Sequence, residues 1–301
     1  MSARPDPQRT LAGAVHTADL IRAALAEDLG ERGDITSALA LGGRGPPAVA
    51  RIVAKAPGRV SGVDVAAQVF LAVDEAADVS VRCRDGAAVR PADEVLVVRA
   101  PAASLLEAER TALNFLTHLS GVATLTARFV AAVAGTSAKI VDTRKTTPGL
   151  RQLEKRAVRH GGGTNHRIGL WDEVLLKENH FAMGGQDHAR MVAQVKAVAP
   201  AGTRITAEAR TEDEAWAVAD GGADCILLDN FSIAGLAQAV SRLASHPRRT
   251  AFQLEASGGV SLETVGAIAH TGVDRISIGA LTNSAPVLDL SLLIDEQPGR
   301  P

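Results

Sequence analysis

The sequence predicts an α/β protein in which a small antiparallel region precedes a run of βα units. Residues 138–279 alternate short apolar runs with amphipathic segments that are each about one helix long. Residues 48–98 instead hold short β-branched runs separated by Pro-Gly and Asp-Gly turns. A chain of 301 residues with 46% hydrophobic content is long enough for one large core or two modest ones.

The first part of the chain is predicted to combine helices with the small sheet. Residues 17–29 show apolar spacing of helical type, and the next stretch, GERGDITSALALGGRGPP, has the composition of a loop. One helix, around VDVAAQVFLAV, is expected to interrupt the sheet of residues 48–98. SLLEAERTALNFLTHLSG is predicted to be a packed helix with Arg110 off its apolar stripe, and ATLTARFVAAVAG a second helix that ends at Gly135.

The later part of the chain is predicted to form parallel strands joined by helical crossovers. The expected strands are KIVDT, EVLLK, RITAEA, DCILLD, AFQLEA and DRISIG. The expected helices between them include DHARMVAQVKAVA, TEDEAWAVADGGA, SIAGLAQAVSRLAS and SLETVGAIAHTGV. This order implies either a doubly wound sheet or a closed or partly open (β/α) barrel.

Composition excludes several classes of partner. The formal charge of -2 gives the whole chain no electrostatic reason to bind nucleic acid or an anionic membrane, and the 3% of aromatic residues, with no Tyr, argue against base stacking. No apolar run approaches the roughly 20 residues that span a bilayer. Cys83 and Cys225 lie far apart and predict neither a disulfide framework nor a thiolate metal site. We therefore expect a cytoplasmic protein without a nucleic-acid or membrane partner.

Residues that could take part in chemistry or in ligand binding lie at or just after the end of each predicted strand. They are Asp142, Arg144, Lys145, Lys177, Glu208, Asp229, Ser257 and Gly279. In a (β/α) barrel these positions map to the C-terminal rim, which is where active sites of that fold lie. The sequence therefore predicts that separate segments converge on one pocket.

Positive charge is concentrated in residues 142–180 of a chain that is slightly acidic overall. Arg144, Lys145, His166, Arg167 and Lys177 lie at strand ends or beside the glycine turn at 161–163, so we interpret them as an anion site. The alternating charges of QLEKRAVRH, in contrast, are typical of a solvated helix face.

Two further groups of residues suggest a phosphate and a cation. The loops ASGGV and IGALT follow the last two strands, where backbone N–H groups of barrels often bind phosphate. Glu208 and Asp229 end adjacent strands, and hard oxygen ligands of this kind suit Mg²⁺ that bridges protein and substrate. The alternative is that each carboxylate caps a helix or pairs with Lys145 or Lys177.

Several blocks of the chain together resemble the quinolinate phosphoribosyltransferase family. They are EDLGERGDITS, DTRKTTPGLRQLEKRAV, GGGTNHRIGLWDEVLLKENH, ILLDNF, EASGGV and GVDRISIGALTNSAPVLDLSL, and the likeness covers about residues 17–293. The resemblance implies an N-terminal α/β sandwich domain, residues 1–118, and an open (β/α) barrel domain, residues 119–288. It also implies that the tail 289–301 packs on the first domain and that the chain forms a homodimer or a dimer-based hexamer with shared active sites.

The resemblance further implies a reaction. Members of the family join quinolinate to 5-phosphoribosyl 1-diphosphate with Mg²⁺, and they release pyrophosphate and CO₂ to give nicotinate mononucleotide for NAD biosynthesis. A dicarboxylate and a diphosphate together require Arg forks, Lys point charges and a cation in one pocket. The cluster of positive charge would then match the substrates and not the net charge of the protein.

The family's motifs imply a role for each matched residue. Arg144, His166 and Arg167 would hold the quinolinate carboxylates, and Arg110 would reach into the neighbouring subunit's site. Lys145 and Lys177 would bridge the carboxylates and the diphosphate. Glu208 and Asp229 would meet the ribose hydroxyls and Mg²⁺, and the phosphate would be bound by Ser257, Gly258 and Gly279. Two positions depart from the family's pattern, because Thr206 stands where an acidic residue is usual and Asn283 where a His is common.

Three other readings of the sequence remain. A phosphoribosyl-transferring paralogue, such as the molybdenum-transport-associated homologue, would share the fold but not the acceptor. A lipoyl-like carrier module would fit RCRDGAAVRPADEVLVV, but it requires a carrier Lys at a hairpin tip. A barrel aldolase would use Lys177 as a Schiff base and would leave the surrounding Arg and His residues unexplained.

Overall fold

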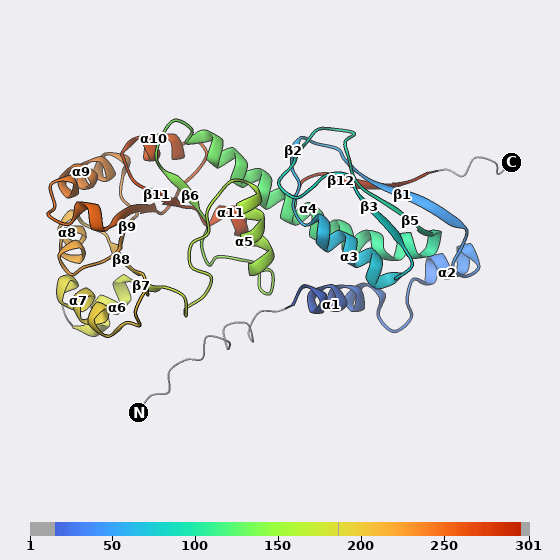
Figure 1. The fold of residues 1–301 in the computed structure, drawn as a ribbon, viewed down its shortest axis with the longest axis horizontal. Helices are drawn as coiled ribbons and strands as arrows, with labels where there is room; N and C mark the ends of the chain where they lie inside the picture. Colours follow the sequence, from blue (N-terminus) through green and yellow to red (C-terminus); the bar gives the residue numbers. More distant parts are fainter. Residues whose placement is uncertain (1–15, 186, 296–301) are drawn as a thin grey trace, which may run out of the picture. The chain divides into compact units, whose positions relative to one another are not determined.

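The computed structural model describes residues 16–185 and 187–295. The chain divides into two compact units. The described part of the first unit covers residues 16–124, 147–160 and 285–295, and that of the second covers residues 125–146, 161–185 and 187–284. Figure 1 shows both units with their elements labelled.

The first unit is built on a four-stranded antiparallel sheet with strand order β12-β1-β5-β3. Helix α3 packs on β3 and β5, and α1 packs on α3. The elements of this unit are α1 (Thr17–Leu29), α2 (Ile35–Leu41), β1 (Pro47–Ala54), β2 (Gly58–Arg59), α3 (Val63–Val73), β3 (Asp78–Val81), β4 (Ala88–Val89), β5 (Glu94–Pro101), the first part of α4 (Ala102–Ala132), α5 (Arg151–His160) and β12 (Leu290–Ile294). Strand β12 comes from the end of the chain and pairs with β1 at the edge of the sheet.

A single helix, α4, replaces the two helices expected between residues 104 and 135. Gly121 lies inside it, and a Cβ atom at this position would stand 2.1 Å from the carbonyl oxygen of Pro286. The glycine therefore serves close packing and does not end the helix, so the expectation of two helices was wrong. Helix α4 is long and apolar enough to cross a membrane, but Leu105, Leu116 and Leu119 are fully buried, which is how the core helix of a folded unit behaves.

The second unit is a six-stranded parallel sheet with strand order β6-β11-β10-β9-β8-β7. Its strands are β6 (Lys139–Val141), β7 (Val174–Leu176), β8 (Ile205–Ala209), β9 (Cys225–Asp229), β10 (Gln253–Ser257) and β11 (Arg275–Ser277). Its helices are α6 (Glu178–Gly184), α7 (His188–Val198), α8 (Glu212–Asp220), α9 (Ile233–Ala244), α10 (Val265–His270) and α11 (Ala280–Asn283), with a 3₁₀ turn, η2, at Arg249–Ala251.

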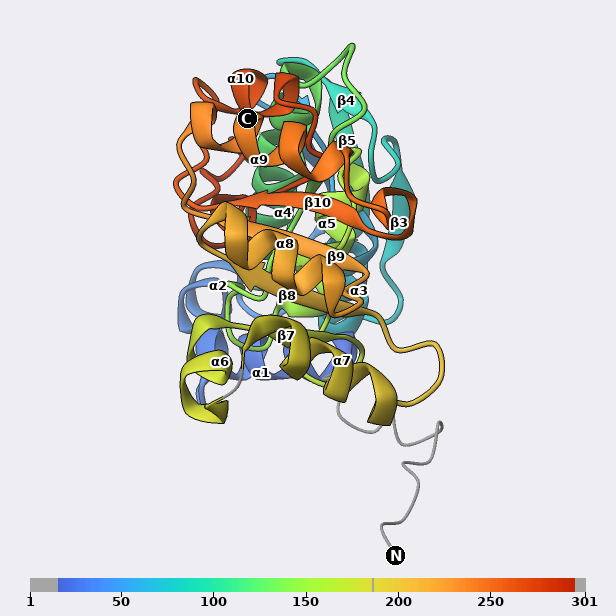
Figure 2. The ribbon, with the colours of Figure 1, turned by 90° about the vertical axis from the view of Figure 1, so that its left-hand side faces the viewer.

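The strand order decides between the architectures that the sequence left open. Strands β6 and β7 are consecutive among the strands of the chain, yet they lie at the two edges of the sheet, and no pairing between them closes it in the described part of the chain. Helices α7, α8, α9 and α10 cover the outer side of the row of strands (Figure 1). Figure 2 looks onto this unit, with β10, β9, β8 and β7 stacked in that order. The prediction of an α/β chain with an open (β/α) arrangement is confirmed.

The strands read as apolar runs because both faces of the sheet are covered, as is usual in parallel sheets. All five residues of β8 are buried, and Ile226, Leu228, Leu254 and Ile276 are completely inaccessible. The polar side chains are therefore confined mainly to the strand ends and to a few inward positions, and these positions form the site.

The packing at Gly121 gives a stability prediction. We expect Gly121→Ala to lower the free energy of unfolding by about 1–3 kcal/mol, because the added methyl group would press on the carbonyl oxygen of Pro286. Alanine would otherwise favour a helix over glycine by about 1 kcal/mol. Chemical denaturation of the two proteins measures the difference.

Gly266→Ala in helix α10 is the matched control. A Cβ atom at Gly266 meets its nearest neighbour, the carbonyl oxygen of Ala132, at an ordinary 3.5 Å, so this variant should be neutral or more stable. Equal effects of the two substitutions would contradict the packing argument.

Candidate active site

A cavity of about 630 Å³ lies in the second unit at the C-terminal ends of the parallel strands. Lys177 follows β7, Arg210 follows β8, Asp229 ends β9 and Ser257 ends β10, and all of these residues line it. Parallel strands place their carboxyl ends at one edge of the sheet, so side chains that are far apart in sequence meet there.

Most of the residues that the sequence singled out line this cavity. They are Arg144, Lys145, His166, Arg167, Lys177, Glu208, Asp229 and Ser257. The lining also includes residues that the sequence analysis did not single out: Thr143, Leu175, Glu178, Arg210, Leu227, Asn230, Glu255 and Ser277. The prediction that separate segments converge on one pocket is therefore confirmed by the structure.

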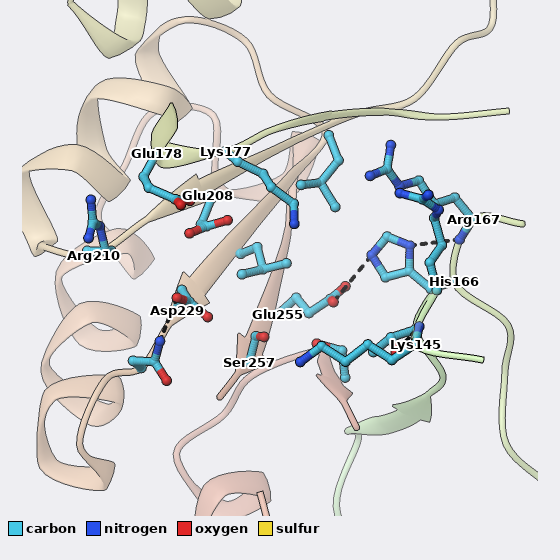
Figure 3. A pocket seen from close by; sticks show the side chains of 16 residues that line it. Lys145, His166, Arg167, Lys177, Glu178, Glu208, Arg210, Asp229, Glu255 and Ser257 are labelled. Carbon is cyan, nitrogen blue, oxygen red and sulfur yellow. Dashed lines mark hydrogen bonds and ion pairs between the residues drawn. The ribbon is translucent and has the colours of Figure 1, made fainter. Parts of the chain in front are cut away.

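The cavity has two chemically different sides, which Figure 3 shows from close by. His166 and Arg167 lie on one side, and Glu178, Glu208 and Asp229 lie on the other, together with Arg210. Lys177 extends between the two sides. A ligand that carries anionic groups at one end and metal-binding or hydroxyl groups at the other matches such a division.

The basic side is carried by a loop, residues 161–173, that contains no helix or strand. Asp142, which follows β6 and is fully buried, fixes the start of this loop. Its carboxylate accepts hydrogen bonds from the backbone N–H of His166, at 2.8 Å, and from the side-chain amide of Asn165, at 2.5 Å. The loop is thus tied to the sheet by a buried charge.

Arg167 is held near the cavity at both of its ends. Its backbone N–H donates to Nδ1 of His166 at 2.7 Å, and its Nη1 donates to the carbonyl oxygen of Glu173 at 3.1 Å. Burial, and after it the like charge of Arg144, lowers the pKa of the Arg167 guanidinium. Two arginines near one another in a buried site favour an anionic ligand, because such a ligand relieves their repulsion.

Glu255 lies under the basic side, in the middle of β10, and is completely buried. Its Oε1 is 3.4 Å from Nε2 of His166, and its Oε2 is 3.2 Å from Nε of Arg275 on β11. Burial alone would raise the pKa of this carboxyl group, but His166 and Arg275 together hold it below its ordinary value. Glu255 is therefore an ionised carboxylate that lines a cavity rich in cations.

The acidic side crowds three carboxyl groups together. Burial first, and then Glu178 and Asp229, raise the pKa of Glu208 to about 7. A hydrogen bond from the Glu208 carboxyl group is in turn the first cause that lowers the pKa of Glu178. Glu208 and Asp229 stand on neighbouring parallel strands, which is the arrangement that the sequence predicted.

The acidic side fits Mg²⁺ that arrives with a ligand better than a permanently bound metal. Among residues 16–185 and 187–295, no group of three or more His, Cys, Asp or Glu side chains is arranged to hold a metal ion by itself. Mg²⁺ commonly uses only one or two carboxylates, with waters and substrate phosphates as its other ligands. The crowded negative charge around Glu208 is what such a cation would neutralise.

The glycines predicted to bind phosphate occupy places where a side chain would not fit. A Cβ atom at Gly279 would lie 2.9 Å from Cδ of Lys145, so this glycine lets the lysine side chain lie across it. Gly258 has φ +104°, and a Cβ atom there would lie 2.2 Å from Oδ1 of Asn230. Thr282 also donates a hydrogen bond to the carbonyl oxygen of Lys145 at 2.7 Å. Phosphate binding by these glycines stays a prediction.

Six residues named from the sequence do not line the cavity: Asp142, Gly258 and Gly279, described above, and Arg110, Thr206 and Asn283. Arg110 lies on α4 in the first unit, and its expected role in a neighbouring subunit's site stays a prediction. Thr206 is fully buried, and its hydroxyl donates to Oε1 of Glu173. Asn283 accepts a hydrogen bond from the hydroxyl of Ser284 at 2.7 Å.

Some of the cavity residues that the sequence analysis missed carried a usable signal. Glu178 and Arg210 directly follow predicted strands, so the rule that located Lys177 and Glu208 would have located them too. Glu255 was harder to find, because it lies inside a strand and not at its end. Its signal is a carboxylate inside the predicted strand, with Leu254 and Ala256 on either side of it, and a buried charge of that kind is rare unless it is paired.

Two family models match the chain over almost its whole described length. The model for the N-terminal domain of quinolinate phosphoribosyl transferase matches residues 34–120, and the model for its C-terminal domain matches residues 122–293. The two matches meet within α4.

Relatives and solved structures point to the same family. The chain is 43% identical to the nicotinate-nucleotide pyrophosphorylase [carboxylating] of Mycobacterium leprae over 91% of this chain and 95% of that protein. It is 39% identical to the probable enzyme of the same name from Bacillus subtilis, over 88% and 89%.

The nicotinate-nucleotide pyrophosphorylase structure from Francisella tularensis superimposes with a TM-score of 0.85 at 36% identity, over 93% of this chain and 96% of that one. Family models, relatives and structures thus agree across both units. The chain belongs to the quinolinate phosphoribosyltransferase family.

Proposed function

We propose that the chain transfers the phosphoribosyl group of 5-phosphoribosyl 1-diphosphate to quinolinate, with loss of CO₂, to give nicotinate mononucleotide and pyrophosphate. The observation that carries this proposal is the divided cavity. Arginine and lysine side chains gather around its basic side, three carboxylates form its acidic side, and both belong to one pocket of a chain in this family. Its relatives are named for this activity.

The basic side is proposed to bind the pyridine dicarboxylate. Arg144 and Arg167 offer planar groups that pair with carboxylates through two hydrogen bonds each, and His166 lies beside them. Lys145 and Lys177 would interact with both the carboxylates and the diphosphate. In this arrangement the ring nitrogen of quinolinate faces the anomeric carbon of the second substrate.

The acidic side is proposed to bind the ribose hydroxyls and Mg²⁺. Glu208 and Asp229 would hold the cation, with Glu178 beside them. Mg²⁺ supplies positive charge that stabilises the departing pyrophosphate. Ser257, Gly258 and Gly279 would contact the 5-phosphate, since they lie at strand ends where small residues allow close backbone approach.

The chemistry itself needs no covalent bond to the protein. The pyridine nitrogen attacks the anomeric carbon as the C–O bond to pyrophosphate breaks, through a state with oxocarbenium character. The task of the residues is then to align the two substrates and to stabilise charge. CO₂ leaves afterwards, because the pyridinium nitrogen stabilises the electron pair left on the adjacent ring carbon, and that carbon then takes up a proton.

The proposal also includes an oligomeric state and a cellular location. Arg110 would complete the site of a second copy, so the active form would be a homodimer or a larger dimer-based assembly. We place the chain in the cytoplasm, and we propose no nucleic-acid or membrane partner. Its chain-wide charge of -2 supports this reading.

The reaction is tested with purified protein, quinolinate, 5-phosphoribosyl 1-diphosphate and Mg²⁺, with nicotinate as the parallel acceptor. We expect nicotinate mononucleotide from quinolinate only, detected by chromatography. Arg144→Ala should lower kcat/KM at least 10- to 100-fold, because a charge-assisted pair to a carboxylate is lost. The matched control is Arg190→Ala, which removes an exposed arginine of α7. Absence of product from quinolinate with a folded sample rejects the proposal.

The raised pKa of Glu208 predicts how cation binding depends on pH. Below about pH 7 the Glu208 carboxyl group is protonated and neutral, and above it the group is ionised. Apparent affinity for Mg²⁺ with pyrophosphate should therefore rise roughly tenfold between pH 6 and pH 8, measured by calorimetry. Glu208→Gln should bind weakly and should keep only the shallower pH dependence that comes from protonation of pyrophosphate itself. An equally steep pH dependence in this variant would assign the titration to another group.

The raised pKa of Glu208 also predicts that the contribution of this residue to stability falls as the pH rises, whereas the affinity for the cation rises. The folded pKa of Glu208, about 7, is above the ordinary value of 4.5, so the folded state holds a proton that the unfolded state has released in this range. Its contribution to stability is complete below about pH 4.5 and is lost as the pH rises to about 7. Glu208→Gln should therefore melt at a higher temperature than the parent protein at pH 8, and the gain should shrink at pH 5. A constant difference at both values would contradict the assignment.

A further inference from the structure

We propose that Glu255 is a positioning residue that fixes His166 as a neutral imidazole with its proton on Nε2, and that it thereby orients the basic side of the cavity. The inference rests on the proposed function and deepens it, because it explains how the side of the cavity that is proposed to bind quinolinate is held in place. It rests on contacts within the second unit, which Figure 3 shows around His166.

The first contact defines the protonation of the imidazole ring. The backbone N–H of Arg167 donates to Nδ1 of His166 at 2.7 Å, so Nδ1 acts as an acceptor and carries no proton. A neutral ring must then carry its proton on Nε2. A doubly protonated ring would place an N–H at Nδ1 against the N–H of Arg167, which is unfavourable.

The second contact gives that proton a partner. Nε2 of His166 lies 3.4 Å from Oε1 of Glu255, which is within ion-pair distance, and within the described residues Oε1 has no hydrogen-bond partner. The two side chains are 6% and 0% exposed, so water does not weaken their attraction. The ring is therefore held between a backbone donor on one side and a carboxylate on the other.

The third contact keeps the carboxylate charged although it is buried. Arg275 is the partner of Glu255 in the register between β10 and β11, and its Nε lies 3.2 Å from Oε2. The pair is nearly inaccessible to solvent. A buried carboxylate without such a partner would be costly, so Arg275 lets Glu255 act as a fixed negative charge.

Together these contacts connect the sheet to the loop that carries Arg167. They run from Arg275 to Glu255, then to the ring of His166, and then to the backbone of Arg167. Residues 161–173 contain no helix or strand, and this connection helps to hold the loop in place. It acts together with the hydrogen bonds from the loop to Asp142, between Thr164 and β6, and from Ile168 and Gly169 to Asp172. His166 then presents a neutral ring to quinolinate, the proposed acceptor of the phosphoribosyl group. The positive charge around quinolinate comes from the arginine and lysine side chains.

The direct test is NMR of the histidine rings in the substrate-free protein labelled with ¹⁵N-histidine. Long-range ¹H–¹⁵N spectra report which nitrogen carries the proton, and His166→Gln assigns the signal. We expect His166 to show Nε2–H alone near neutral pH, with a ring N–H proton that exchanges slowly with water. A signal from Nδ1–H or from a doubly protonated ring would overturn the proposal. This result does not depend on which reaction the protein catalyses.

Two double variants distinguish a positioning role of Glu255 from an effect on folding. Glu255→Met with Arg275→Met replaces the ion pair by apolar side chains of similar size, which commonly leaves stability unchanged or raises it. Glu255→Gln with Arg275→Met keeps an oxygen that can accept from Nε2–H. The slowly exchanging N–H signal should persist in the Gln variant and be lost in the Met variant.

Kinetics of the same pair test the consequence for the acceptor. KM for quinolinate should rise roughly tenfold in the Met variant, which corresponds to about 1.4 kcal/mol, and less in the Gln variant. KM for 5-phosphoribosyl 1-diphosphate should change by less than about threefold, because none of its proposed contacts belongs to the connection from Arg275 through Glu255 and His166 to Arg167. An unchanged KM for quinolinate in a folded Met variant would refute the positioning role. If the parent protein gives no product, the proposed function fails, while the NMR result still decides the position of the proton.

Gln253→Leu is the matched control. Gln253 lies two residues before Glu255 on β10 and also accepts from an arginine, Nη2 of Arg204, at 2.6 Å, but it does not line the cavity. Its substitution disturbs a polar pair on the same strand without touching His166. It should leave the His166 signal and both KM values unchanged, and a change equal to that of the Met variant would show that any perturbation of β10 suffices.

Discussion

The site depends on holding like charges close together at one edge of a parallel sheet. Arginines and lysines share a cavity of about 630 Å³ with Glu178, Glu208 and Asp229, and each set repels itself when no ligand is present. The raised pKa of Glu208 and the lowered pKa of Arg167 have burial as their first cause and this repulsion as a further one. A rigid sheet, with strands fixed by their hydrogen bonds and buried side chains, can maintain such an arrangement, because its backbone cannot relax to separate the charges.

Buried carboxylates position the loop that carries His166 and Arg167. Asp142 accepts from the backbone of the loop at His166, and Glu255 pairs with the His166 ring while Arg275 balances its charge. A loop without regular structure would otherwise place Arg167 loosely, since a backbone of that kind has few hydrogen bonds of its own. The carboxylates beneath the basic side therefore contribute to the geometry of the site.

The two departures from the family's pattern have different consequences. Thr206 is a buried neutral residue that donates to Glu173, so this place holds one buried carboxylate and not two. It does not line the cavity, and Glu208 is retained at the cavity wall. Asn283 stands beside Gly279, in the segment where Lys145 packs, and accepts from Ser284. The main contacts of the acidic side are thus independent of either change.

The sequence by itself determined most of the element types, the strand-end location of most site residues and the family, because apolar periodicity and ordered motifs are local properties of a chain. It missed helix α2, which forms in a stretch with the composition of a loop, and it wrongly placed Lys155 on a solvated helix face, because this side chain is buried. It did not determine that Gly121 lies inside one long helix, because a glycine that ends a helix and one that allows close packing look alike until Pro286 is placed beside it. It also did not reveal Glu255, whose partners His166 and Arg275 come from distant segments. Only the tertiary structure decides which buried charges meet, because that depends on strand order and register, and these are set by the packing of the whole sheet.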